Sequence, residues 1–167
     1  MIDHVNAVSV KREALSVYVR GHINKMPVKY MLVDSGSTVT LISDVLWRAC
    51  VDSNKCTLEP VEGRFITANK TTLRVLGQTT VFFNVAGLHA STRVYVTRDL
   101  AQHCILGNDF LAENKCDVLY GSKQFVTPCG RAELRLENRG QQSTSACSVI
   151  FFEEAEAPAS LIAEDNS

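Results

Sequence analysis

The sequence has no long apolar run, almost no net charge and no closely paired cysteines. No apolar stretch approaches the roughly 18 residues that span a bilayer. The first 20 residues carry charges where a secretory signal would need an apolar centre. We therefore expect a cytoplasmic protein without a membrane partner. The net charge of −1 offers no electrostatic attraction for nucleic acid, so none is expected to bind.

The cysteines lack the spacing of a metal site. None of the six forms a Cys-x-x-Cys pair, and no histidine lies at ligand spacing from one. We therefore expect no metal and no other cofactor. Because no secretory signal is present, the thiols are expected to be reduced. The six are Cys50, Cys56, Cys104, Cys116, Cys129 and Cys147.

The chain is long enough for one domain with a sizeable core. It has 167 residues, of which 46% are hydrophobic. Residues 1–127 carry 14 basic and 11 acidic groups, whereas residues 128–167 carry 3 and 7. The predicted organisation is a polar lead-in (1–13), a folded domain (14–127) and an acidic, partly disordered tail or linker (128–167).

Alternation of apolar and polar residues predicts a protein built mainly of strands. An alternating strand begins near Leu15, and a turn at 24–25 leads to a second strand over 28–33. Two short helices are predicted, one over 41–50 capped by Ser43 and one that starts at Asn108 or Asp109. Enrichment in β-branched and aromatic residues predicts further strands over 64–67, 71–76, 79–85 and 91–96, and a terminal hairpin over 117–126.

One acidic residue ends the first predicted hairpin. The apolar run 30–33 delivers Asp34 into a tight turn, where an ionised carboxylate is costly unless something holds or uses it. The hydroxyls of Ser35 and Ser37 are candidates to donate hydrogen bonds near it, and Gly36 permits close backbone approach. Two structural roles also fit this residue: a cap for the segment 40–48, or support for the turn.

A facing pair of such acids hydrolyses amides well, whereas a single one does so poorly. Like charges about 3 Å apart cannot both ionise, so the two carboxyl groups share one proton. The ionised member takes a proton from a water, and the protonated member polarises the scissile carbonyl. Asp34 is the one aspartate of the chain followed by Ser or Thr and then Gly. The second acid must then come from another copy of the chain, across a two-fold axis.

Two motifs resemble those of the retropepsin family. The first is Leu32-Val33-Asp34-Ser35-Gly36-Ser37 followed by Leu41-Ile42, and the second, about 70 residues later, is Ile105-Leu106-Gly107-Asn108-Asp109-Phe110-Leu111. The nearest resemblance is to the proteases of LTR-retrotransposon (Ty3/gypsy-type) or retroviral polyproteins, and it covers roughly residues 14–127.

The resemblance implies a mostly β, closed antiparallel barrel-like acid-protease fold with one or two short helices. It also implies an aspartic endopeptidase that is active as a homodimer on peptide or polyprotein substrates. The location it implies is the cytoplasm, including virus-like particles.

The resemblance also assigns roles to residues of both motifs. Asp34 is catalytic, Ser35 locks the two active-site loops together across the dimer axis, and Gly36 permits the turn. Ser37 takes the position that hydrogen-bonds the outer oxygen of the aspartate. Ile105, Leu106 and Gly107 form a second loop packed under the first. Asp109 is assigned to the helix start and not to a second acid.

A mobile hairpin, the flap, closes over the substrate in that family, and residues 65–75 are its candidate here. Retroviral flaps are glycine-rich at the tip, whereas this chain has no glycine between Gly63 and Gly77.

The tail contains the apolar segment 148–152 followed by Glu153 and Glu154. Its sequence fits a docking strand, an edge-pairing strand or a peptide that another protein recognises.

Two further functions fit the same sequence. One is a retropepsin-like domain of a host protein that serves in dimerisation or substrate binding with little or no proteolysis. The other is a small β-barrel binding module in which Asp34 is a structural cap.

Overall fold

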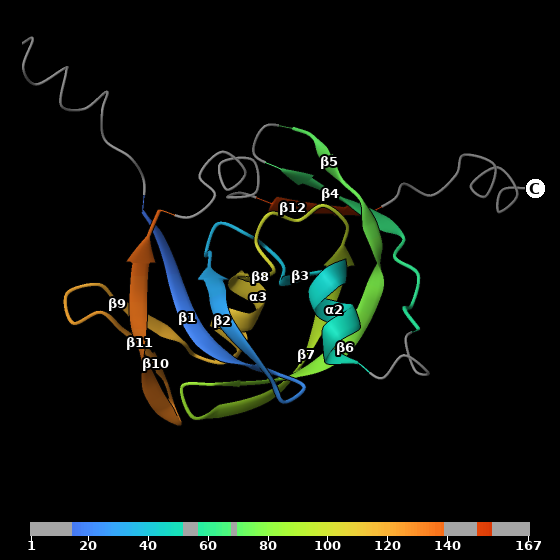
Figure 1. The fold of residues 1–167 in the computed structure, drawn as a ribbon. Coiled ribbons are helices and arrows are strands. Elements are labelled where there is room, and N and C mark those ends of the chain that lie inside the picture. Colours follow the sequence, from blue (N-terminus) through green and yellow to red (C-terminus); the bar gives the residue numbers. More distant parts are fainter. Residues whose placement is uncertain (1–14, 52–56, 68–69, 139–149, 155–167) are drawn as a thin grey trace, which may run out of the picture.

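A closed ring of strands forms the centre of the molecule. The computed structural model describes residues 15–51, 57–67 and 70–138, and the backbone of 150–154 (Figure 1). The main sheet contains β1 (Ser16–Ile23), β2 (Met26–Val33), β3 (Leu41–Ser43), β6 (Val75–Val85), β7 (Leu88–Thr97), β8 (Cys104–Leu106), β9 (Asp117–Leu119), β10 (Gln124–Thr127) and β11 (Gly130–Glu137). These nine strands follow the order β2-β8-β3-β7-β6-β1-β11-β10-β9, and β1 also pairs with β2. The β1–β2 pairing closes the first part of this order into a ring.

A second, smaller sheet and two short helices complete the described fold. The small sheet has the order β12-β4-β5 and consists of β12 (Ile150–Glu154), β4 (Gly63–Thr67) and β5 (Thr72–Leu73). The helices are α2 (Asp44–Cys50) and α3 (Asn108–Glu113). The predicted fold class, mostly β with two short helices, is confirmed. Among the described residues, no helix has the length and apolarity to cross a membrane.

The first hairpin forms where its sequence pattern predicts. The turn to β2 lies at Asn24 and Lys25, and Val17 and Val19 are buried on one face of β1. The predicted one-faced burial is wrong, because Tyr18 on the other face is fully buried and Leu15 is exposed. These two turn residues have φ values of 49° and 70°, as a two-residue hairpin turn of matching twist requires. Gly21 lies where the β1–β2 register shifts, and a Cβ there would come within 2.7 Å of the Asn84 carbonyl oxygen. The absence of a side chain at Gly21 therefore lets β1 approach β6.

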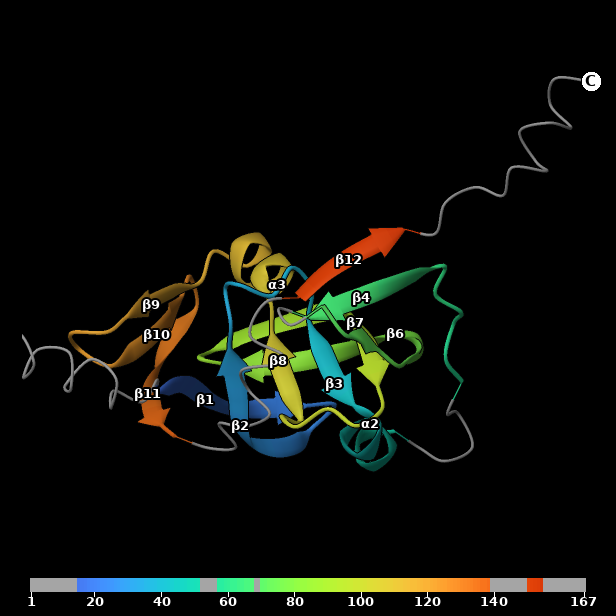
Figure 2. The ribbon, with the colours of Figure 1, turned by 90° about the horizontal axis from the view of Figure 1, so that it is seen from above.

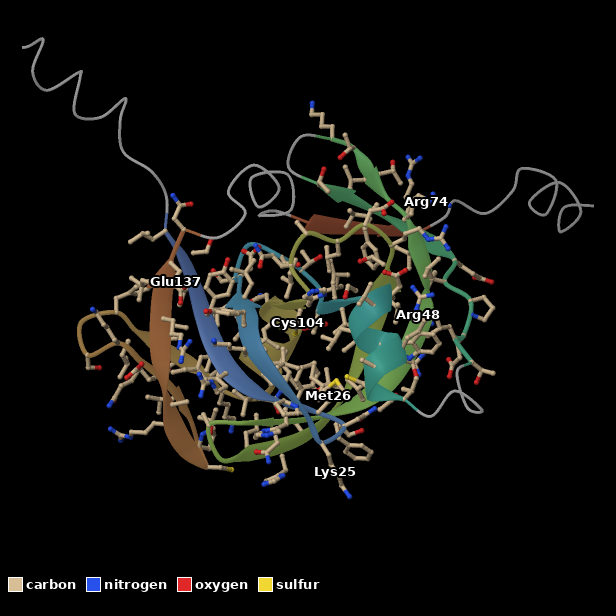
Figure 3. All side chains as sticks on the ribbon, in the orientation of Figure 1. Lys25, Met26, Arg48, Arg74, Cys104 and Glu137 are labelled. Carbon is tan, nitrogen blue, oxygen red and sulfur yellow. The ribbon has the colours of Figure 1, made fainter. Side chains whose placement is uncertain are left out.

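The hydrophobic core fills the ring. Val19, Met31, Val94 and Leu106 are fully buried there, and α3 adds Phe110, whose ring lies 5.0 Å from that of Phe83. Figure 3 shows Cys104 near the centre of the molecule, in agreement with its complete burial. Packed side chains thus fill the ring of strands and support the loops at its ends.

The first predicted helix begins later than its sequence suggested. Leu41, Ile42 and Ser43 form strand β3, which pairs parallel with β7 and antiparallel with β8, and all three are buried. Two strand partners outweigh the local helical preference of this segment. Helix α2 starts at Asp44, and the Ser43 hydroxyl accepts a hydrogen bond from the Leu46 N–H at 3.0 Å. The predicted cap at Ser43 is confirmed.

Two strands lie in the region that the sequence assigned to the tail. Strand β11 pairs antiparallel with β1, from Ser16 opposite Glu137 to Val19 opposite Leu134, and also pairs with β10. Strand β12 pairs antiparallel with β4 over five residue pairs, so the tail segment is an edge-pairing strand. Figures 1 and 2 show β12 beside β4, and Figure 1 shows β5 on the other flank of β4.

Candidate active site

Strand β8 holds Asp34 at the end of β2. Leu32 and Val33 pair parallel with Ile105 and Leu106, and the Asp34 N–H donates to the Leu106 carbonyl at 3.0 Å. Strand β3 pairs with the other side of β8. The loop 34–40 therefore passes over the end of β8, because the strands before and after it, β2 and β3, both pair with β8. Ile105 and Leu106 are fully buried beneath it.

The second predicted loop packs against the first without space for a side chain. The N–H of Asn108 donates to the Ser37 carbonyl at 2.7 Å. A Cβ at Gly107 would overlap the carbonyl group of Val39, so the residue there has to be glycine. The structure thus brings together the residues of the two motifs.

A polar bridge that sequence reasoning missed connects the same two loops. The Thr40 hydroxyl donates to Asp109 Oδ1 at 2.7 Å, and the Thr40 N–H donates to Asp109 Oδ2 at 3.2 Å. The Thr40 hydroxyl also accepts from the Gly107 N–H at 3.1 Å. Asp109 lies in the first turn of α3, as predicted, but its carboxylate also bridges 69 residues of sequence. The sequence signal for this bridge was a polar residue shortly after each glycine turn, Thr40 after Gly36 and Asp109 after Gly107.

One oxygen of the Asp34 carboxyl group is satisfied and the other is not. The Gly36 N–H donates to Oδ1 at 3.0 Å. Oδ2 is buried and has no hydrogen-bond partner in the described part of the chain. Burial raises the pKa of Asp34 from 3.8 to about 6, against the lowering effect of the backbone N–H groups of Gly36 and Ser37. This carboxyl group is therefore available both as a proton donor and as an acceptor at mildly acidic pH.

Ser37 is arranged differently from the expectation. Ser35 and Gly36 are exposed. The Ser37 hydroxyl is buried and donates to the Val39 carbonyl at 2.7 Å, so it supports the loop and does not bind Asp34. The alternative in which Asp34 caps the segment 40–48 is wrong, because Ser43 caps α2.

The candidate flap is a hairpin that packs down on the ring. Strands β4 and β5 pair with Phe65 opposite Leu73. Phe65 is fully buried in a cluster with Leu32 and Ile105, and its ring lies 4.7 Å from that of Tyr95. Near the tip, Thr67 and Thr71 join through their hydroxyls at 2.7 Å, and the Thr67 N–H donates to the Thr71 carbonyl. A hydrogen bond between two threonine hydroxyls thus joins the two sides of this hairpin next to its tip, which contains no glycine.

A family of acid proteases matches the part of the chain that contains this geometry. The family model, described as gag-polyprotein putative aspartyl protease, matches residues 19–113, which is more than half of the sequence. The chain belongs to this family. The match includes both motifs, and the aspartyl protease family is the one that the sequence resemblance indicated. In the described residues, no group of three or more His, Cys, Asp or Glu side chains is placed to hold a metal ion.

Two solved structures are similar to this aspartyl protease domain. The retroviral protease-like domain of Ddi1 from Leishmania major is 22% identical, with a TM-score of 0.58 over 74% of this chain and 98% of that one. The EIAV protease in complex with the inhibitor HBY-793 is 20% identical, with a TM-score of 0.46 over 66% of this chain and 95% of that one. The Ddi1 match shows that the fold is retropepsin-like.

Proposed function

We propose that this aspartyl protease domain is an endopeptidase that is active as a homodimer. The observation that carries the proposal is the state of Asp34, whose Oδ2 is buried without a hydrogen-bond partner among the described residues and whose pKa is raised to about 6. A buried acceptor without a partner is costly, and active sites are where such costs are found. A second carboxyl group that shares a proton with it offsets this cost.

The exposed turn beside Asp34 supports pairing with a second copy. Ser35 and Gly36 are exposed, while the loop behind them is fixed by β8 and by Asp109. A rigid loop with an exposed tip suits a contact across a two-fold axis, where the same surface meets itself. In this arrangement the two Asp34 carboxyl groups face each other, and the two Ser35 residues lie beside the axis.

The chemistry then follows from the shared proton. One Asp34 is ionised and takes a proton from a water held between the two carboxyl groups. The other is protonated and donates a hydrogen bond to the carbonyl oxygen of the scissile peptide bond. The water oxygen attacks the carbonyl carbon and the carbonyl oxygen takes the proton of the second Asp34. The C–N bond then breaks as the first Asp34 gives the proton it took from water to the amine nitrogen, and the second Asp34 regains a proton from a hydroxyl of the tetrahedral species. The substrate is an extended peptide within a polyprotein, as the family description suggests.

Peptide cleavage by purified protein tests the proposal. We expect hydrolysis of peptides with bulky apolar residues around the scissile bond, with a maximum at mildly acidic pH because the pair needs one proton. Asp34→Asn should abolish hydrolysis, and an inhibitor of aspartic proteases should block it. Asp117→Asn, which changes an exposed aspartate on β9, is the matched control and should leave the rate unchanged. Equal hydrolysis by Asp34→Asn and the unchanged protein would overturn the proposal.

The alternative is a domain for dimerisation or substrate binding with little or no proteolysis. It predicts a dimer that binds a peptide without cleaving it. Sedimentation run beside the cleavage assay distinguishes the two, because a dimer without hydrolysis at any pH supports only the alternative.

A further inference from the structure

The outer edge of the flap strand β4 carries a peptide strand from the tail. In the described structure β12 pairs with β4 along its whole length, from Ile150 opposite Thr67 to Glu154 opposite Gly63. The other edge of β4 pairs with β5. Without β12, β4 would present a row of unpaired N–H and C=O groups, which is a template for binding an extended chain.

The position of β12 lies next to the candidate active site. Figures 1 and 2 both draw the start of β12 close to the loop that joins β2 to β3, which carries Asp34. The flap hairpin itself packs, through Phe65, in one cluster with Leu32 and Ile105 beneath that loop. A strand on this edge of β4 therefore lies where an extended substrate would meet both the flap and Asp34.

The sequence of β12 has the chemistry of an occupant of such a site. Ile150, Phe151 and Phe152 are bulky and apolar, like the residues expected around a scissile bond. The register also sets the acidic Glu153 opposite the basic Arg64, a combination that favours strand pairing. The connection 139–149 is 11 residues long, which spans about 35 Å when extended and keeps β12 at an effective concentration of about 1 mM.

We propose that the outer edge of β4 is the peptide-binding edge of this protease and that the chain's own segment 150–154 occupies it, in competition with substrate. This inference rests on the proposed function for its kinetic consequence. With an effective concentration of about 1 mM against a dissociation constant of about 0.1 mM, in the range of KM values for enzymes, the tail raises the apparent KM about tenfold. Because the competition is for free enzyme, kcat is unchanged.

Two proline substitutions in the full chain test the competition. Successive residues of a strand point their N–H groups to opposite sides, so Phe151→Pro with Phe152→Pro removes at least one N–H that faces β4. We expect this variant to cleave a peptide substrate with a KM about tenfold lower and an unchanged kcat. Leu161→Pro, beyond β12, is the matched control and should behave as the unchanged chain. A synthetic peptide of residues 148–156 should inhibit the double-proline variant competitively. An unchanged KM in that variant would overturn the proposal.

Hydrogen exchange tests the pairing without relying on activity. The Thr67 N–H donates to Thr71 on the β5 side, so by alternation the N–H groups of Arg64 and Ile66 face β12. In an Asp34→Asn background, which removes self-cleavage, the amides of Arg64 and Ile66 should exchange at least tenfold faster when both prolines are present, whereas the Thr67 amide should not change. Equal exchange with and without the prolines would overturn the assignment of β12 to this edge. Absence of hydrolysis in every variant would instead overturn the proposed function, and the exchange result would still decide the pairing.

Discussion

The Asp34 carboxyl group lies at the end of a buried strand, and its environment favours the protonated form. Its pKa is raised from 3.8 to about 6, so the folded chain holds this proton more tightly than the unfolded chain does. The stability that the group contributes is therefore fully present below about pH 4 and is lost as the pH rises past 6.

Replacing Asp34 by asparagine should stabilise the isolated chain at neutral pH. The substitution removes a charge that burial disfavours, and the gain at pH 7 should be about 1 kcal/mol because the side chain is partly exposed to solvent. At pH 3, below the pKa of the unfolded carboxyl group, the two proteins should unfold with nearly the same free energy. Urea unfolding at a concentration where sedimentation shows monomers measures both values. A gain of equal size at the two pH values would mean that ionisation is not its cause.

Asp109 and Thr40 hold the two loops of the site in one arrangement. Asp109→Ala should lower the free energy of unfolding by about 2 kcal/mol, because the Thr40 N–H and hydroxyl lose their acceptor in a partly buried place. A double-mutant cycle with Thr40→Val should show a coupling of about 1 kcal/mol. Additive losses in the cycle would indicate that Asp109 acts only on its own helix.

At the scale of elements, the contact between the loop 34–40 and the start of α3 requires glycine. Gly107→Ala places a methyl group against the Val39 carbonyl and should lower the free energy of unfolding by about 2–4 kcal/mol. Gly121→Ala is the matched control, because a Cβ at Gly121 meets no atom of the described part of the chain within 4 Å, and its effect should stay within about 0.5 kcal/mol. Thermal or urea unfolding of the two variants measures the difference. Similar losses in both would show that backbone freedom, and not the loop contact, sets the cost.

Local signals predicted the elements whose pattern is complete within the segment. Strand β1 forms where its alternation begins, although Tyr18 on its expected polar face is fully buried, and the Ser43 cap and the glycine turn at 107 have direct sequence signatures. Strand β11 also alternates, with Ala132, Leu134 and Leu136 between charged residues, but the acidic composition of the region concealed it.

Long-range partners decide the features that the sequence did not predict. The segment 41–43 is a strand because β7 and β8 flank it, and Asp109 bridges to Thr40 because the fold brings residues far apart in the chain together. The apolar segment at 150 left three roles open, and only its pairing with β4 selects one. Register between distant strands is set by the whole sheet, so neither local propensity nor composition contains it.

At the scale of the whole molecule, the closed ring explains why one chain presents only half of the proposed site. The ring fixes β2, β8 and β3 and thereby the loop 34–40, which carries a single acid motif. The exposed turn at Ser35 and Gly36 is the surface through which a second copy would complete the site. Hydrolysis should therefore depend on protein concentration, with a rate per chain that falls on dilution below the dimer dissociation constant.

The most direct test of the shared site is a mixture of unchanged protein and Asp34→Asn at fixed total concentration. If each site needs an Asp34 from both copies, mixed dimers are inactive. Activity then falls with the square of the unchanged fraction, so an equal mixture that has exchanged subunits should retain about one quarter of the activity. Retention of one half, in proportion to the unchanged protein, would show that each chain works alone and would contradict the account.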